Sequence, residues 1–143
     1  METSSALGND PDSLLRRIKY DIDGAASNGK ALNDLLEEFH RGYPTKELVE
    51  LSRSSNPSVV RAAAWLLSQL GTAACAHSSN FWRLMESTDP EIRFSLIDCV
   101  IVCAGDSDGD VIAKLIDFLL DASSAVRWKA LDALVKLSER QLD

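Results

Sequence analysis

A short pattern recurs three times along the chain, at a spacing that suits stacked pairs of helices. Each copy has a β-branched residue, then arginine, then a run of small or apolar residues, and the copies begin at Val60, Ile92 and Val126. Successive copies are 32 and 34 residues apart. Units of this length are two-helix hairpins, each too thin to bury its own apolar face, so that neighbours supply each other's core. The repeat predicts an all-α protein built from helical hairpins.

Local signals place the individual helices. Apolar residues recur at helical spacing between the glycines and prolines, and no segment alternates with period two for long enough to predict a strand. At Asp10-Pro11, Asn56-Pro57 and Asp89-Pro90 a capping residue precedes a proline, which suits the first helical position because proline has no N–H to leave unpaired there. We expect helices over residues 11–23, 30–41, 45–54, 57–70, 79–87, 90–104, 109–121 and 124–139.

The size of the chain indicates one domain. Its 143 residues, of which 45% are hydrophobic and 26% charged, have the composition of a folded globular protein. The first helical pair has no repeat pattern, which is typical of an end cap. We therefore predict a single domain over residues 1–143, with a helical cap over 1–43 and hairpins over 44–71, 72–105 and 106–143.

The middle copy of the repeat is similar to a known family. Asp89-Pro90-Glu91-Ile92-Arg93, with small or apolar residues at positions 96, 99 and 103, resembles the second helix of a HEAT repeat. The third copy has Ser123-Ser124 in place of Asp-Pro, and the first has one extra residue before Val60. The resemblance covers about residues 45–139 and implies a short right-handed α-solenoid, but it is nearly silent on function.

The resemblance also implies what the motif residues do. In HEAT families the aspartate and the arginine of this motif link adjacent repeats. It therefore implies structural roles for Asp89, Arg61, Arg93 and Arg127.

The charge of the chain bears on its partner and its location. The formal net charge is −7, whereas binding nucleic acid needs clustered Lys and Arg to neutralise phosphates. No apolar run approaches the length of a membrane span, and the first residues lack the basic and apolar parts of a signal peptide. We expect a cytoplasmic monomer that binds a basic protein and neither nucleic acid nor a membrane.

The three cysteines, Cys75, Cys99 and Cys103, predict free and mostly buried thiols. Their number is odd and their neighbours are apolar, whereas a secreted scaffold of this size usually has a denser, even set. Cys99 and Cys103 are four residues apart and could share a helix face as ligands of a soft metal, but nothing supplies the other ligands. Packing in the core is the preferred interpretation.

Chemistry-bearing motifs are weak. The acidic string from Asp106 to Asp110 suggests a calcium loop, but its glycine comes too early and Asp117 stands where an EF-hand has a closing glutamate. We expect a polar turn before a helix, where negative charge is favoured. The two histidines, His40 and His77, have no partner at metal spacing, and Cys75 has no orienting third residue for catalysis. We predict no catalytic residue, metal or cofactor, and no enzymatic activity.

The repeat register identifies candidate binding residues. An aromatic residue stands two positions after the β-branched residue in the last two copies, and an aspartate follows four positions later, on the same helix face. The HEAT resemblance places these second helices on the concave, partner-binding side. Rings supply buried area and cation–π contact and carboxylates pair Lys or Arg, which suits a basic guest; the alternative is that the rings fill space between repeats. The candidate residues are Phe94, Asp98, Trp128 and Asp132.

These features favour an interaction protein. In size, charge and fold the chain resembles bacterial immunity proteins, including those of contact-dependent inhibition systems, which neutralise cognate toxins that are often basic. That resemblance implies an inhibitor of a basic toxin. The alternative is a scaffold, adaptor or accessory subunit of a larger assembly.

Overall fold

The structure is a computed structural model that describes residues 10–26, 29–105 and 108–142. Throughout these residues the regular structure is helical and no strand is present, which confirms the all-α prediction. The chain divides into two compact units, Met1–Leu70 and Gly71–Asp143. The expectation of one continuous domain stays a prediction.

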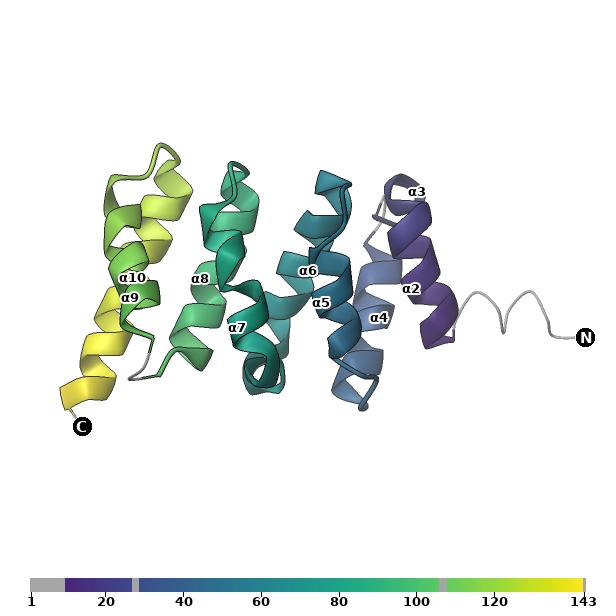
Figure 1. The fold of residues 1–143 in the computed structure, drawn as a ribbon, viewed down its shortest axis with the longest axis horizontal. Helices are drawn as coiled ribbons and strands as arrows, with labels where there is room; N and C mark the ends of the chain where they lie inside the picture. The colour runs from purple at the N-terminus through teal and green to yellow at the C-terminus, as the bar shows by residue number, and fades with distance from the viewer. Residues whose placement is uncertain (1–9, 27–28, 106–107, 143) are drawn as a thin grey trace, which may run out of the picture. The chain divides into compact units, whose positions relative to one another are not determined.

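The described residues of the first unit form five helices, labelled in Figure 1: α2 (Pro11–Tyr20), α3 (Ile22–Ala26), α4 (Lys30–His40), α5 (Lys46–Ser52) and α6 (Pro57–Leu70). Helix α2 packs on α4, α5 packs on α6, and α6 also contacts α4. Three consecutive alanines, residues 62–64, are buried on α6. The core of this unit includes apolar side chains with almost no exposed surface: Leu14, Ile18, Leu35, Leu48, Leu51, Val59 and Leu66.

The second unit mixes α-helices with 3₁₀ turns: η1 (Gly71–His77), α7 (Ser78–Phe81), η2 (Trp82–Glu86), α8 (Pro90–Cys103), α9 (Gly109–Asp117), η3 (Phe118–Leu120) and α10 (Ser124–Leu142). Helix α8 is central, because it packs on η1, η2, α9 and α10. The core contains Phe81, Leu96, Ile97, Val100, Leu115, Val126, Ala130 and Ala133.

Capping explains why the helices begin where the sequence predicts. The Asn56 side chain accepts a hydrogen bond from the backbone N–H of Ser58 at 3.0 Å, and that of Asp89 accepts one from Glu91 at 2.9 Å. Both bonds satisfy N–H groups that have no partner within the helix. Asp10 stands at the equivalent position before Pro11 but makes no side-chain capping bond.

Four segments differ from the expected helices, and two of them are simple: η1 covers Gly71–His77, where no helix was expected, and the helix expected over 109–121 ends in the 3₁₀ turn η3. The helix predicted over 11–23 breaks at Asp21, whose backbone leaves the helical region (φ −145°, ψ 51°), and Ile22 then enters the core as the start of α3. The α-helix predicted over 79–87 is mostly 3₁₀, with only four α-helical residues in α7. The buried Phe81 and Leu84 are three residues apart, which suits the three-residue turn of a 3₁₀ helix.

One helical stretch among the described residues, Pro57–Glu86, is long and apolar enough to cross a membrane, judged by length and composition alone. Its α6 part supplies core residues to the first unit, among them Val59, Leu66 and Leu67. A buried core helix has the same composition, so this stretch is weak evidence for a span.

Candidate protein-binding surface

Helix α10 is apolar on two opposite faces. One face is buried within the second unit, where α10 packs against α8, α9 and η3; it carries Val126, Ala130, Ala133 and Leu137. The other face carries Trp128, Leu131 and Val135, whose exposed fractions are 70%, 45% and 50%. Their spacing of three and four residues places them in one row along the helix. We call these three residues the α10 stripe.

A row of large exposed apolar side chains is unusual on a protein surface. Scattered ones are common, as Tyr20 at the end of α2 illustrates, but contiguous patches mark interaction sites. Tryptophan is also among the residues that contribute most to protein–protein binding. The α10 stripe is therefore the strongest candidate for an interface among the described residues.

The predicted pair of Phe94 and Asp98 on α8 already holds a cation. The Nζ atom of Lys129 on α10 lies 2.8 Å from Oδ1 of Asp98 and 5.0 Å from the centre of the Phe94 ring. All three side chains lie at the junction of α8 and α10 and are only partly exposed. The aromatic–carboxylate arrangement thus binds a basic group, as its chemistry suggests, but the group belongs to the same chain.

The second predicted pair, Trp128 and Asp132, is more open. Asp132 forms an ion pair with Lys136 at 2.9 Å, one turn along α10, and both side chains are more than half exposed. The hydrogen bond to Asp132, and then its charge, raise the pKa of Lys136. Exposed pairs of this kind contribute little to stability, so a partner's cation can compete for Asp132 at small cost.

The sequence-based search missed Leu131, Val135 and Lys129. Leu131 occupies the same repeat register as Ile97, which is fully buried on α8, so that register indicated a core position. The spacing of Trp128, Leu131 and Val135 was visible in the sequence, but a helix with two apolar faces looks like an interior helix. The role of Lys129 had no signal, because it depends on how two helices are rotated against each other.

A partly buried ion pair links α8 to the turn before α10. Nε and Nη2 of Arg93 each donate a hydrogen bond of 2.8 Å to the Asp121 carboxylate, and Nη1 donates one of 2.9 Å to the Ser87 carbonyl. The Asp121 carboxylate also accepts the Ser123 N–H at 2.9 Å. The hydrogen bonds from Arg93 are the main reason that the pKa of Asp121 is lowered. Arg93 therefore has a structural role, as the HEAT resemblance implied, and Asp89 caps α8.

The prediction of free thiols is wrong for two of the three cysteines. Cys75 of η1 and Cys103 at the end of α8 form a disulfide, and both are partly exposed. Only Cys99 is free; it is buried, and burial raises the pKa of its thiol to about 12. The disulfide joins residues 28 positions apart, which contact each other because η1 packs on α8. Disulfides are typical of oxidising compartments.

The described part of the acidic segment before α9 is a polar turn. Asp108 receives the Gly105 N–H at 2.9 Å before α9, which suits the expected polar turn; Asp106 and Ser107 lie outside the described residues. Among the residues that the structure describes, no group of three or more side chains could hold a metal ion.

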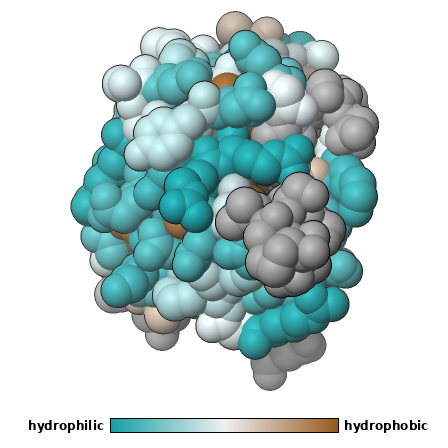
Figure 2. Space-filling model, turned by 90° about the vertical axis from the view of Figure 1, so that its right-hand side faces the viewer, coloured by the Kyte–Doolittle hydropathy of each residue, from teal (hydrophilic) through white to brown (hydrophobic). Residues whose placement is uncertain are grey.

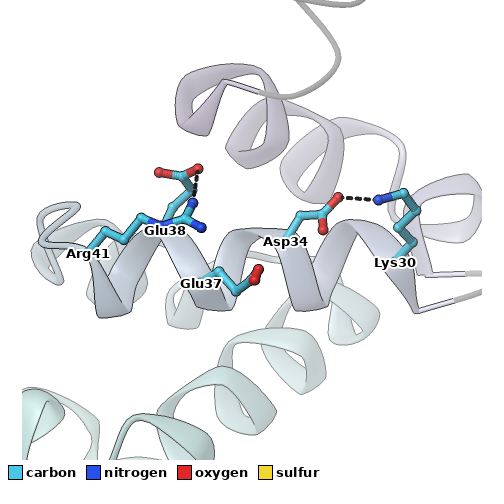
Figure 3. A pocket seen from close by; sticks show the side chains of 5 residues that line it. All are labelled: Lys30, Asp34, Glu37, Glu38 and Arg41. Atoms are coloured by element: carbon cyan, nitrogen blue, oxygen red, sulfur yellow. Dashed lines mark hydrogen bonds and ion pairs between the residues drawn. The ribbon is translucent and has the colours of Figure 1, made fainter.

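A surface hollow of about 340 Å³ in the first unit runs along α4 (Figure 3). It is lined by Lys30, Asp34, Glu37, Glu38 and Arg41. Both cations are paired with carboxylates of the same helix, at 3.0 Å for Lys30 with Asp34 and 3.3 Å for Arg41 with Glu38. Because every side chain comes from one helix and the charges pair along it, this is a solvated helix face.

Figure 2 shows the first unit from the side where α2 and α3 lie, and this face is mainly hydrophilic. The fold and the surface define an all-helical protein with an exposed apolar row on α10.

Comparison with protein-family models, with curated proteins and with solved structures finds no match to this chain.

Proposed function

We propose that this chain is a protein-binding module without catalytic activity, metal or cofactor, and that it binds a basic protein through the α10 stripe and the neighbouring Asp132. The observation that carries the proposal is the exposed row of Trp128, Leu131 and Val135. The row provides an apolar centre with an aromatic anchor, and Asp132 provides a polar rim, which is the usual anatomy of an interface.

The charge distribution supports a basic partner. Residues 71–143, which include the stripe, contain twelve acidic and seven basic residues, a formal charge of −5 out of −7 for the whole chain. Four of the cations, Arg93, Lys114, Lys129 and Lys136, form ion pairs with carboxylates of the same chain. The field around this half of the chain therefore attracts a basic protein and raises its association rate at low salt.

Phe94 and Asp98 can bind a partner only if Lys129 moves away, because its Nζ atom already contacts both side chains. Replacing Lys129 with alanine exposes the ring and the carboxylate to an incoming Lys or Arg. If the pair contributes to binding, the variant should bind the partner more tightly. An unchanged affinity would assign Phe94 and Asp98 to the α8–α10 junction alone.

The finer proposals concern architecture and biological role. We propose a short right-handed solenoid of HEAT-like hairpins with a helical cap over residues 1–43, supported by the Arg93–Asp121 link. Within the protein-binding class we propose a cytoplasmic, monomeric inhibitor or immunity protein for a basic toxin. An adaptor subunit is the second candidate. It is favoured by α10, which is apolar on two opposite faces like a helix in the interior of a protein but has one of these faces exposed. The disulfide between Cys75 and Cys103 weighs against the cytoplasm.

Affinity capture with the full chain from the cells that make it tests the proposal. The wild type should retain a protein of basic isoelectric point that elutes as salt rises. Trp128→Ala should lose it, while Tyr20→Ala should retain it, because Tyr20 is an exposed aromatic ring that lies in the other unit, away from the α10 stripe. An acidic partner, or one that both variants retain equally, would refute the proposal. If the captured protein is toxic, its inhibition by the chain separates an inhibitor from an adaptor.

A further inference from the structure

The same arginine contact occurs twice in the second unit, one repeat apart. Nη1 of Arg93 donates to the carbonyl of Ser87, six residues earlier, at 2.9 Å. Nη1 of Arg127 donates to the carbonyl of Asp121, also six residues earlier, at 2.7 Å. Both arginines follow the β-branched residue of the repeat. The two guanidinium groups are therefore held in the same way at the start of α8 and of α10.

The two arginines differ in what their other nitrogens bind. Nε and Nη2 of Arg93 bind both oxygens of Asp121, which lies in the turn before the next long helix. Arg127 is exposed, and in the part of the chain that the structure describes its Nε and Nη2 have no partner. Two donors that form a fork fitted to a carboxylate are thus left open on α10.

The α10 stripe also has an equivalent on α8, and the residues on α10 are again the more exposed ones. Trp128 and Leu131 occupy the registers of Phe94 and Ile97, which belong to the helix on which α10 packs. Ile97 has no exposed surface, whereas Leu131 is 45% exposed. The outer face of α10 therefore resembles the face of α8 in both of its components, an apolar row and an arginine fork. On α8 the arginine fork binds the hairpin that follows, and α10 packs against that helix.

We propose that the outer face of α10 docks a helical hairpin of a different protein, which packs on the α10 stripe and places a turn carboxylate on Nε and Nη2 of Arg127. This inference rests on the proposed function and specifies the form of its partner. The partner is basic overall, and the carboxylate that binds Arg127 is a single acidic group within its basic surface.

A second copy of this chain is a poor occupant for two reasons. The turn carboxylates that precede α8 and α10, Asp89 and Asp121, already have partners, the Glu91 N–H and Arg93. Two copies would also bring together like charges, since each chain has a formal charge of −7. A different protein supplies the missing carboxylate without this repulsion.

The test attaches a hairpin of known structure to the chain in place of residues 138–143. Leu137 stands in the register of Cys103, so a second copy of residues 104–143 joined after Leu137 keeps the repeat spacing. The added copy carries phenylalanine in place of its tryptophan, and the emission of Trp128 is obtained by subtracting the spectrum of the same extended chain with Trp128→Phe. The added hairpin contains no cysteine and leaves the disulfide unchanged.

If the face is a docking surface, the added hairpin covers Trp128, shifts its emission to shorter wavelength and reduces its quenching by acrylamide. In the added copy, the residue equivalent to Asp121 is the one expected to bind Arg127. Replacing it with asparagine should then lower the melting temperature by roughly 5 °C or more. Arg127→Gln should lower it by a similar amount, and the two changes together should cost no more than the larger one. Unchanged Trp128 emission, or additive effects of the two substitutions, would overturn the inference.

The capture experiment separates this inference from the proposed function. Arg127→Gln should release the captured partner as Trp128→Ala does. A partner that Trp128→Ala releases but Arg127→Gln retains would leave the proposed function standing and contradict the hairpin docking. If the added hairpin docks but no basic protein is captured, the α10 face can dock a hairpin and the proposed function is contradicted.

Discussion

Replacing Asp121 with asparagine perturbs a largely buried ion pair. The Arg93 and Asp121 side chains are only 14% and 9% exposed, and two hydrogen bonds of 2.8 Å join them. Asparagine keeps one oxygen for Arg93 or for the Ser123 N–H but removes the charge and one of the acceptors. Breaking a buried pair costs about 3–5 kcal/mol, and Arg93 keeps its bond to Ser87, so we expect a loss of about 2–3 kcal/mol.

The cost should depend on pH in a defined direction. Hydrogen bonds from Arg93 hold the pKa of Asp121 below its ordinary value, which is about 3.9 in an unfolded chain. A carboxyl group with a lowered pKa in the folded state stabilises the fold fully above its unfolded pKa and loses that contribution as pH falls through its folded pKa. The difference between wild type and Asp121→Asn should be constant near neutral pH and shrink below about pH 4.

Urea unfolding followed by circular dichroism, from about pH 7 to about pH 2.5, measures this difference. Asp117→Asn on α9 is the matched control, because Asp117 is exposed and no contact of its side chain is found in the described part of the chain; it should change stability by less than about 0.5 kcal/mol. A cost below about 1 kcal/mol for Asp121→Asn, or one that stays the same at low pH, would show that the pair does not stabilise the α8–α10 junction.

Three further predictions concern cysteines and packing. Reducing the disulfide of Cys75 and Cys103 should lower the free energy of unfolding by about 3.5 kcal/mol, because it releases a loop across 28 positions in the unfolded chain; urea unfolding with and without dithiothreitol measures it. Cys99, with its pKa raised to about 12 by burial, should resist iodoacetamide at about pH 8 until urea is added, as mass spectrometry will show. Trp128→Ala should change stability by less than about 0.5 kcal/mol, whereas Leu96→Ala, fully buried, should cost about 2–5 kcal/mol in denaturant unfolding.

Helix positions were predictable because their signals are local. Capping residues and prolines set the starts of α6 and α8, and Asn56 and Asp89 cap those helices as expected. The region around Phe81 was not predictable as 3₁₀, because the choice between a turn of three residues and one of 3.6 depends on which side chains the rest of the unit buries. The break at Asp21 depends in the same way on the burial of Ile22.

Pairing between distant side chains was beyond the sequence. Three cysteines allow several pairings or none, and the choice of Cys75 with Cys103 follows from the packing of η1 on α8. The candidate binding residues show the same limit. Their types and register were readable, but the sequence could not show that Lys129 fills the space between Phe94 and Asp98.

A carboxylate at a helix junction is an ambiguous signal for binding, because burying it without a cation is costly and the fold tends to supply one. Asp98 illustrates this, since its partial burial is matched by Lys129 from the adjoining helix. Arg127 differs, because two of its nitrogens remain open where the equivalent arginine has a carboxylate. Trp128 also stays exposed in the register where Phe94 meets its neighbour. Arg127 and Trp128 therefore indicate an interface more sharply than residue type does. Each lacks a contact that the equivalent residue of the preceding repeat makes.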